Sequence, residues 1–426
     1  MNWPNAPLGR LAKMVGGGTP SKKNDAFWTG GDIPWVSPKD MSSREVWDAE
    51  DHITQAAVEG SATQVVPEGS VLVVVRSGIL VRRVPVAIAR VPVALNQDMK
   101  ALLPGGPLEP DYLAYALEAQ AEHVLAGCVK RGATVHSIDI GKFNHLQLAV
   151  PPPSEQHRIV EILDQADALR KKRAEADAKA ARILPALFYK MFGDPATNPK
   201  GWPVKRLGDP RVATVNPKFS VSNIPAEMEV SFVPMADVDE VWGRIVGTQM
   251  RPYSDVMRGF TPFQDNDVLF AKITPCMQNG KAAIARNLIN GRGFGSTEFH
   301  ILRAGPEATP EWLYALVRMV WFRKQAEASF TGTAGQQRVP ADFLIRYEVA
   351  CPPLDLQHAF AKAVSRIAEW IEQTEQVRRK TKDIFSLLLH RAFTGDLTTQ
   401  WREAHMKELL QEMEQQATAL NLRMES

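Results

Sequence analysis

The chain has 426 residues, of which 45% are apolar and 23% charged, so it is long enough to bury two or three domain cores and is not a disordered tail. Fifty Lys and Arg residues against 48 Asp and Glu residues give a net charge of +2, which lacks the basic excess usual in a protein that holds nucleic acid alone. No apolar stretch has the length of a membrane span, and the start lacks the regions of a signal peptide. The three cysteines, Cys128, Cys276 and Cys351, lie too far apart for a Cys-x-x-Cys site. We therefore expect a soluble protein of the cytoplasm.

Residues 1–153 predict a globule of mixed α/β (α+β) structure. Short β-type runs at 71–75, 84–88 and 147–150 are separated by Gly, Pro, Asn and Asp, which favour turns. Proline cannot continue a strand ladder, so Pro151-Pro152-Pro153 marks the end of this globule.

A long helix is expected next, from about Ser154 to Phe192, within a segment bounded at 154–195. Ser154 is a suitable N-cap, and Glu155 places an acid in the first turn. Mostly apolar or small residues then recur at steps of three and four, which is typical of a coiled-coil seam: Ile159, Ile162, Ala166, Leu169, Arg173, Ala176, Ala180, Ile183 and Leu187. Pro185 is expected to kink the last turns.

The second half repeats this plan. Runs at 229–233, 268–273 and 299–302 predict a second globule over 196–353, which ends at Pro352-Pro353. A second helical segment, at 354–400, carries the same stripe: Phe360, Val364, Ile367, Ile371, Thr374, Arg378, Thr381, Phe385 and Leu388. We expect the two helices to pack against each other, with burial of each stripe in a globule core as the alternative. A tail at 401–426 has one apolar face and no counterpart in the first half: Met406, Leu409, Met413, Ala417, Leu420 and Met424.

Matched motifs indicate a tandem repeat with a period of about 200 residues. Pro110-Asp111-Tyr112-Leu113 is matched by Pro310-Glu311-Trp312-Leu313, and Gly132-Ala133-Thr134 by Gly332-Thr333-Ala334. The matches keep the same order in both halves, which indicates duplication. Duplication of a structural domain without a shared function stays open as the alternative.

The sequence shows no catalytic constellation. Gly16-Gly17-Gly18-Thr19-Pro20-Ser21-Lys22 lacks the Gly-Lys-Ser/Thr ending of a phosphate loop, and the nine histidines show no metal-ligand spacing. No Gly-x-Ser-x-Gly nucleophile motif appears either. The residues therefore predict a binding protein that has no active site, metal or cofactor of its own.

Polar side chains gather instead in loops at matched places. Gly332 to Arg338 places glycines beside two amides and a guanidinium, and Gln with adenine and Arg with guanine are the pairs that read the major groove. Its counterpart runs from Lys130 to His136, while the turn at 272–281 matches Arg76-Ser77-Gly78 of the first half. For each loop, a solvated turn between strands is the alternative.

Together these residues resemble the specificity (S) subunits of type I restriction-modification systems. The opening of their target recognition domains is similar to Gly17-Gly18-Thr19-Pro20-Ser21, Trp28 and Gly31-Asp32-Ile33-Pro34-Trp35-Val36. Later signatures are similar to Asn96-Gln97, Pro152-Pro153-Ser154-Glu155-Gln156, and Phe393-Thr394-Gly395-Asp396-Leu397 with Trp401-Arg402. The second half lacks the opening motif and its helix begins Leu354-Asp355-Leu356-Gln357, as expected if the two domains read different bases.

The resemblance implies two target recognition domains separated by two helices that pack as an antiparallel coiled coil. These helices would set the gap of an asymmetric bipartite site in double-stranded DNA and dock two modification (methyltransferase) subunits, with restriction subunits as optional further partners. S-adenosylmethionine is then expected on the modification subunit and ATP and Mg on a restriction subunit, with none on this chain. The family also implies a bacterial or archaeal cytoplasm and no membrane.

On these grounds DNA-binding residues are expected in both halves. In the first half they are Thr19, Ser21, Lys22, Trp35, Lys39, Arg76, Arg131, Thr134 and His136. In the second half they are Lys272, Thr274, Gln278, Asn279, Lys281, Gln336, Gln337 and Arg338. Two other functions stay open: a coiled-coil scaffold with two protein-binding globules, which the weak net charge favours, and a free-standing DNA methyltransferase.

Overall fold

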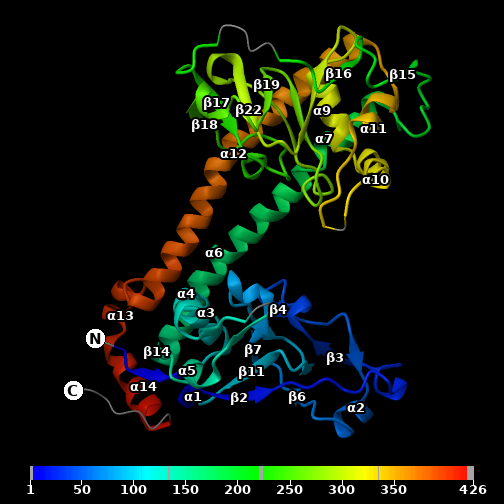
Figure 1. The fold of residues 1–426 in the computed structure, drawn as a ribbon. Coiled ribbons are helices and arrows are strands. Elements are labelled where there is room, and N and C mark those ends of the chain that lie inside the picture. The colour runs from blue at the N-terminus through cyan, green and yellow to red at the C-terminus, as the bar shows by residue number, and fades with distance from the viewer. Residues whose placement is uncertain (1–2, 107, 133–134, 220–223, 334, 420–426) are drawn as a thin grey trace. The chain divides into compact units, whose positions relative to one another are not determined.

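The computed structural model describes residues 3–106, 108–132, 135–219, 224–333 and 335–419 (Figure 1). Its contacts divide the chain into a first unit, Met1–Lys171 with Lys380–Ser426, and a second unit, Lys172–Arg379. Both boundaries fall inside long helices, so each unit contains one globule and part of each helix. Among the described residues, no helix is both long and apolar enough to cross a membrane.

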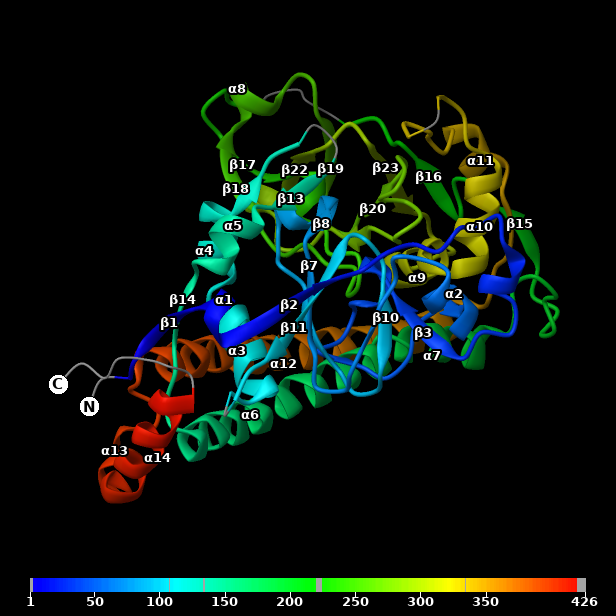
Figure 2. The ribbon, with the colours of Figure 1, turned by 90° about the horizontal axis from the view of Figure 1, so that it is seen from below.

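The first unit is built on a twisted sheet with strand order β2-β11-β7-β9-β4. Its strands are β2 (Ala12–Gly16), β11 (Met99–Pro104), β7 (Val71–Val74), β9 (Val86–Ala89) and β4 (Glu45–Val46). All pairs are antiparallel except β4 with β9. Every residue of β7 is buried, because both faces of this strand are covered. Figure 2 shows β2 and β11 side by side.

Smaller elements complete the first unit. A second sheet has the order β5-β3-β10-β6, formed by β5 (His52–Ile53), β3 (Ile33–Val36), β10 (Val93–Leu95) and β6 (Val65–Val66). A third joins β12 (Val129–Lys130), β13 (His136–Ile138) and β8 (Arg76–Ser77), and β1 (Asn5–Pro7) pairs with β14 (Gln147–Ala149). The helices of this globule are α1 (Leu8–Leu11), α2 (Gln55–Glu59), α3 (Pro110–Ala119), α4 (Ala121–Gly127) and α5 (Ile140–Asn144).

The globule of the second unit has the same plan. One sheet has the order β16-β23-β20-β21, formed by β16 (Ala213–Val215), β23 (Phe299–Ala304), β20 (Val268–Ala271) and β21 (Ala282–Ile284). Another joins β18 (Gln249–Pro252), β17 (Glu229–Val233), β22 (Arg292–Gly295) and β19 (Thr261–Gln264), and β15 (Val204–Arg206) pairs with β24 (Glu348–Ala350). Its helices are α8 (Tyr253–Val256), α9 (Pro310–Arg318), α10 (Val320–Ala328) and α11 (Ala341–Arg346). The predicted strand runs are confirmed, with ends shifted by up to two residues.

The predicted long helices are α6 (Pro153–Ala180), followed by α7 (Ile183–Phe192), and α12 (Leu354–Thr394). The predicted kink is a break at residues 181–182, because Pro185 has no amide hydrogen to donate to the preceding turn. The predicted N-cap is wrong. The helix begins at Pro153, and the hydroxyl and amide of Ser154 both donate to Glu412, at 2.8 and 3.0 Å.

The two helices run antiparallel, as contacts inside each unit show. In the first unit the part of α6 up to Lys171 lies beside the last part of α12, where the guanidinium of Arg170 lies 4.1 Å from the ring centroid of Phe385. In the second unit the end of α6 lies beside the part of α12 that belongs to this unit, where Arg378 Nε donates to Asp177 at 2.7 Å. The predicted stripe of α12 is buried or half-buried throughout. That of α6 is partly wrong, because Leu169 and Ile183 are 63% and 46% exposed.

A buried glutamine fixes each helix to its own globule. In the first unit, Gln156 accepts from the amide of Glu109 at 2.9 Å and donates to the carbonyl of Pro151 at 2.8 Å. In the second unit, Gln357 accepts from the amide of Thr309 at 2.9 Å and donates to the carbonyl of Pro352 at 2.8 Å. The two helix openings therefore differ in sequence and share this contact.

The C-terminal tail forms α13 (Thr399–Ala404) and α14 (Met406–Ala419), which dock on the first unit. The carboxylate of Glu155 is fully buried and accepts hydrogen bonds from Arg402 at 2.8 Å, Thr398 at 2.6 Å and Trp3 at 2.9 Å. Leu409 and Met413 are buried, as the amphipathic pattern predicts. Leu420 and Met424 of the predicted stripe lie outside the described residues.

Candidate nucleic-acid interface

The loops that the repeat matched are paired in space, in the same way in each unit. In the first unit β8 pairs with β13, so that Arg76 lies opposite Ser137. In the second unit Ile273 forms the equivalent bridge with Arg338, and the amide of Thr274 donates to the carbonyl of Gln337 at 3.0 Å. We call these positions, 76–77 with 136–137 and 273–274 with 337–338, the paired strand ends.

An acidic residue lies beside each pair of strand ends and is joined to it by a backbone hydrogen bond. The carbonyl of Asp98 accepts from the amide of Val75 at 2.9 Å, and the carbonyl of Glu298 accepts from the amide of Lys272 at 2.9 Å. Both acids follow a turn whose side chain caps their amide, Asn96 at 3.0 Å in the first unit and Ser296 at 3.2 Å in the second. Asp98 and Glu298 are therefore equivalent positions of the repeat.

In the first unit, the polar loop at 17–22 meets the same turn. The Thr19 hydroxyl contacts the side chain of Gln97, and the amide of Gly18 donates to the carbonyl of Leu95 at 2.8 Å. A methyl group at Gly17 would lie 1.9 Å from the carbonyl oxygen of Asn96, so only glycine allows this approach. Thr19, Ser21 and Lys22 are exposed beside the turn that closes the strand ends.

Two aromatic side chains support this loop. The Trp35 indole donates to the carbonyl of Gly18 at 3.0 Å, and the Trp28 indole donates to that of Ser21 at 3.2 Å. The two rings pack edge to face with centroids 5.3 Å apart. Trp35 is only 5% exposed, so in this structure its side chain supports the loop and does not present itself to a ligand.

The other expected residues of the first unit differ in their exposure to solvent and in their ion pairs. Arg131 is exposed and His136 half-buried, while Arg76 Nε lies 4.0 Å from Asp98. Lys39 lies 3.0 Å from both Glu50 and Asp51, so its charge is balanced within the unit. Thr134 lies outside the described residues.

In the second unit, Arg338 is held by Glu298. Its Nε and Nη2 donate to the two carboxylate oxygens at 2.9 and 2.8 Å, and its Nη1 donates to the carbonyl of Gln336 at 2.8 Å. The hydrogen bonds from Arg338 lower the pKa of Glu298 below its usual value, and the pKa of Arg338 is raised in turn. The arginine beside the acid therefore comes from one strand in the first unit (Arg76) and from the opposite strand in the second (Arg338).

The turn at 272–281 is held by contacts within the second unit. Gln278 bonds to Thr274 and donates to Glu327 at 2.5 Å, Asn279 donates to Glu240 at 3.2 Å, and the Lys281 ammonium donates to the carbonyl of Met235 at 3.1 Å. These side chains shape the turn in the unbound chain. Gln336 is exposed, and Gln337 and Lys272 are half-buried beside it.

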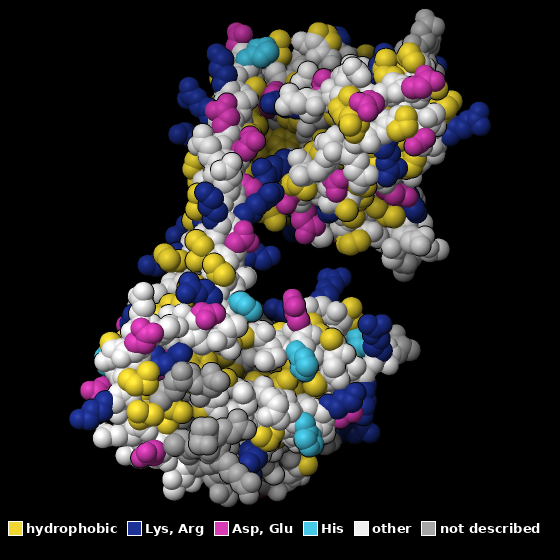
Figure 3. All heavy atoms as spheres, turned by 90° about the vertical axis from the view of Figure 1, so that its left-hand side faces the viewer, with side chains coloured by type: hydrophobic (Ala, Val, Ile, Leu, Met, Phe, Trp, Pro, Cys, Tyr) yellow, Lys and Arg dark blue, Asp and Glu magenta, His cyan; other side chains and the backbone are white. Residues whose placement is uncertain are grey.

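Sequence reasoning missed four residues of this surface. Asp98 and Glu298 were not singled out, although their separation of 200 residues equals the repeat offset. Arg82 and Arg83, which are exposed just after Arg76-Ser77, were also missed, although they are adjacent basic residues. Neither arginine forms an ion pair within the described ranges. On the face in Figure 3, basic and acidic side chains are interleaved, in keeping with the small net charge.

Within the described part of the chain, no group of three or more His, Cys, Asp or Glu side chains could hold a metal ion. His300 is buried, which lowers its pKa, and its ring contacts the carbonyl of Val339 at 2.8 Å and Asn216 at 3.0 Å. Such contacts make it a structural residue beside the paired strand ends.

Comparison with known proteins gives consistent similarities. Residues 1–177 match the family model for the type I restriction modification DNA specificity domain. The specificity subunit of the Escherichia coli EcoR124I/EcoR124II type I restriction enzyme is 44% identical over 168 residues, which are 39% of this chain and 42% of that subunit. The MjaIX specificity subunit of Methanocaldococcus jannaschii is 29% identical over 226 residues, 49% of this chain and 51% of that subunit. The chain thus matches about half or less of the length of these relatives.

Two solved structures share the fold over nearly the whole chain. The S subunit of a type I restriction-modification system from M. genitalium has a TM-score of 0.50 at 13% identity, covering 92% of this chain and 96% of that one. A chain from a structural study of complex assembly and conformational transition in the type I R-M system has a TM-score of 0.51 at 14% identity, covering 93% and 98%.

Proposed function

We propose that the chain is a specificity subunit of a type I restriction-modification system, which reads DNA sequence for a methyltransferase complex without a catalytic activity of its own. The similarity of residues 1–177 to the family model and of parts of the chain to specificity subunits supports this proposal. The observation that carries this proposal is the recurrence of the paired strand ends in both units. The backbone arrangement is the same, whereas the side chains differ. Arg76, Ser77 and His136 of the first unit correspond to Ile273, Thr274 and Gln337 of the second.

The difference in side chains supports an asymmetric bipartite site. Each globule would read one half-site through its own paired strand ends, with arginine and amide groups contacting base edges and nearby basic residues contacting phosphates. Lys22, Arg82, Arg83 and Arg131 are candidates for phosphate contacts in the first unit, because they are exposed on or beside the polar loops.

The helices support a spacer role. α6 and α12 each contribute residues to both units, and they contact each other inside each unit. A helix pair of fixed length would set the number of unread base pairs, each about 3.4 Å long. The gap of the bipartite site is therefore part of the same proposal.

Exposed apolar side chains on the helices support docking of two modification subunits. Leu169, Ile384 and Leu387 are 63%, 55% and 56% exposed, more than a helix facing only water favours. S-adenosylmethionine would bind the modification subunit, and ATP and Mg a restriction subunit where one is present. This chain would supply recognition alone.

The test is selection of DNA by the assembled complex. The chain and its cognate modification subunit are incubated with random duplexes, and bound duplexes are sequenced. We expect two short fixed blocks separated by a constant gap, and no enrichment with the modification subunit alone. Stable assembly without any sequence enrichment would instead support the scaffold function.

A further inference from the structure

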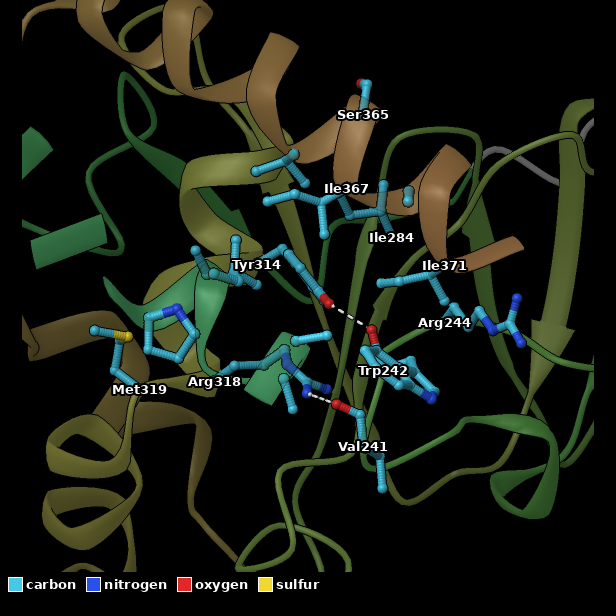
Figure 4. Close-up of a pocket in the computed structure, with 18 of the residues that line it drawn as sticks. Val241, Trp242, Arg244, Ile284, Tyr314, Arg318, Met319, Ser365, Ile367 and Ile371 are labelled. Carbon is cyan, nitrogen blue, oxygen red and sulfur yellow. Dashed lines mark hydrogen bonds between the residues drawn. The ribbon is translucent and has the colours of Figure 1, made fainter. Parts of the chain in front are cut away.

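The second unit contains a cavity of about 340 Å³, which lies among α7, α9, α12 and the loop at 241–244 (Figure 4). Cavities of this size bind small organic ligands. Ile367 and Ile371 of α12 lie on one side, and Trp242, Tyr314 and Arg318 lie opposite, as Figure 4 shows. The Tyr314 hydroxyl donates to the carbonyl of Trp242 at 3.1 Å, which fixes the loop against α9.

The first unit fills the equivalent space with its own side chains. Helices α3 and α9 align from Pro110 and Pro310, so Tyr115 corresponds to Ala315 in the cavity wall. Tyr115 is fully buried, and its hydroxyl donates to Asp164 of α6 at 2.8 Å. The guanidinium of Arg44 lies 3.0 Å from the centroid of its ring. An aromatic ring is thus the group that this position of the fold accommodates.

The charges at the two places are opposite. Glu118 in the first unit corresponds to Arg318 in the second. Glu118 is balanced by Arg44 at 3.4 Å and by Arg170 at 4.0 Å. Ile371 stands at the position of Arg170, because α6 and α12 align from their buried glutamines. The first unit therefore surrounds its ring with a cation and a carboxylate that neutralise each other.

Among the described residues, no carboxylate pairs with Arg318 in this way. Its guanidinium donates to the carbonyls of Gly280 at 3.0 Å, Glu240 at 3.2 Å and Val241 at 2.8 Å. Arg323, also in the wall, bonds to the carbonyls of Arg318 and Gln278, and burial together with the charge of Arg318 lowers its pKa. No Asp or Glu is among the described residues that line the cavity.

We propose that this cavity binds a small aromatic anion, whose ring takes the place that Tyr115 fills in the first unit and whose acidic group lies near Arg318 and Arg323. The ring would pack against Ile371, Trp242 and Ala315 in the cavity wall. The anionic group would supply the negative charge that Glu118 supplies in the first unit. This inference is independent of the proposed DNA recognition.

The test is calorimetric titration of the full chain with naphthoate, beside the neutral analogue naphthylmethanol. We expect one saturable site for naphthoate, and at least about tenfold weaker binding of naphthylmethanol, a difference of about 1.4 kcal/mol. Ala315→Tyr, which copies the first unit, is expected to abolish binding. No saturable binding of naphthoate, or equal affinity for the two compounds, would overturn the proposal.

A second variant keeps the test decisive if Ala315→Tyr fails to fold. Arg318→Gln keeps a hydrogen-bond donor for the loop carbonyls and removes the charge, so naphthoate should bind about tenfold weaker while naphthylmethanol binds as before. Arg258→Gln, at an exposed position of the same unit, is the matched control and should change neither affinity. Equal naphthoate affinity in Arg318→Gln and Arg258→Gln would contradict the assignment.

Discussion

The guanidinium of Arg338 donates two hydrogen bonds, 2.9 and 2.8 Å long, to the carboxylate of Glu298. In the first unit the acid at the equivalent position, Asp98, lies 4.0 Å from Arg76, which comes from the opposite strand. The acid therefore occupies the same position in both units, whereas the arginine that approaches it comes from a different strand in each. The two units thus share one backbone arrangement and present different patterns of polar side chains. Such a pair of surfaces suits the reading of two different half-sites.

Replacing Arg338 by Ala is expected to relax recognition in one half-site only. The cost should be about 1 to 3 kcal/mol for the base pair that Arg338 reads, because it lies on the paired strand ends of the second unit. The measurement is the methylation rate of the assembled complex on duplexes with single changes in each half-site. Arg346→Ala, at an exposed position of α11, is the control. A uniform loss over all sequences would make Arg338 a phosphate contact.

Replacing Arg82 and Arg83 together by Ala is expected to weaken binding to all duplexes alike. Both side chains are exposed beside the first paired strand ends, so they suit phosphates more than base edges. The slope of log affinity against log salt should fall by about one for each lost contact. Binding of the complex is measured by anisotropy over a salt series, with Lys200→Ala as the control. An unchanged slope would exclude these contacts.

Replacing Gln357 by Ala is expected to lower the free energy of unfolding by about 1 to 3 kcal/mol, because the amide of Thr309 loses its buried acceptor. Gln156→Ala should have a similar effect through the amide of Glu109. Urea unfolding measures both. Gln376→Ala, at an exposed position of the same helix, should change stability by less than about 0.5 kcal/mol. Equal stability of Gln357→Ala and Gln376→Ala would show that the buried amide does not fix the helix.

Replacing Arg402 by Ala is expected to destabilise the first unit by about 3 to 5 kcal/mol, because the carboxylate of Glu155 stays buried without its cation. The second unit has Leu356 at the position of Glu155, so an apolar residue at this position should restore stability when Arg402 is replaced. The double variant Glu155→Leu with Arg402→Met should recover most of the loss in thermal unfolding. A double variant as unstable as Arg402→Ala would show that the loss does not come from the unpaired carboxylate of Glu155.

Replacing Asp177 by Asn is expected to lower stability at neutral pH by about 2 kcal/mol, because its charged hydrogen bonds with Arg378 and Arg173 are weakened. Burial alone would raise the pKa of Asp177, but those bonds outweigh it and hold the pKa below the ordinary value. The contribution is therefore full above the unfolded pKa of about 3.9 and is lost as pH falls through the lower folded pKa.

The check on Asp177 is unfolding measured from pH 7 to pH 3. The original chain should lose stability in the acid range more steeply than Asp177→Asn, since the variant lacks this titration. Asp383→Asn, an exposed position on α12, should follow the original chain. Parallel pH curves for the original chain and Asp177→Asn would show that the ion pair contributes nothing.

Much of the fold could be predicted from local pattern. The strand runs and the stripe of α12 follow from alternation and from steps of three and four, which depend only on neighbours in sequence. The N-cap at Ser154 failed because Glu412, distant in sequence, binds its hydroxyl. The stripe of α6 failed at Leu169 because the buried side chain of that turn is Asp167, whose carboxylate pairs with Arg170 and Lys171.

The sequence predicted which loops form the candidate site, but not how their side chains pair in space. The matched offsets identified Arg76, His136, Gln337 and Arg338, which the structure places on the paired strand ends. The role of Glu298 could not be read from sequence, since its pairing with Arg338 depends on which strand ends meet. Trp35 appeared in a polar motif, but its indole is needed to hold the backbone of that loop.

The central claim is tested most directly by mapping methylated bases in the genome of cells that express this chain with its cognate modification subunit, compared with cells that express the modification subunit alone. The account predicts a methylated, asymmetric two-part motif with a constant gap that appears only when the chain is present. If no new motif appears while the modification subunit is active and bound to the chain, the assignment of sequence recognition is wrong.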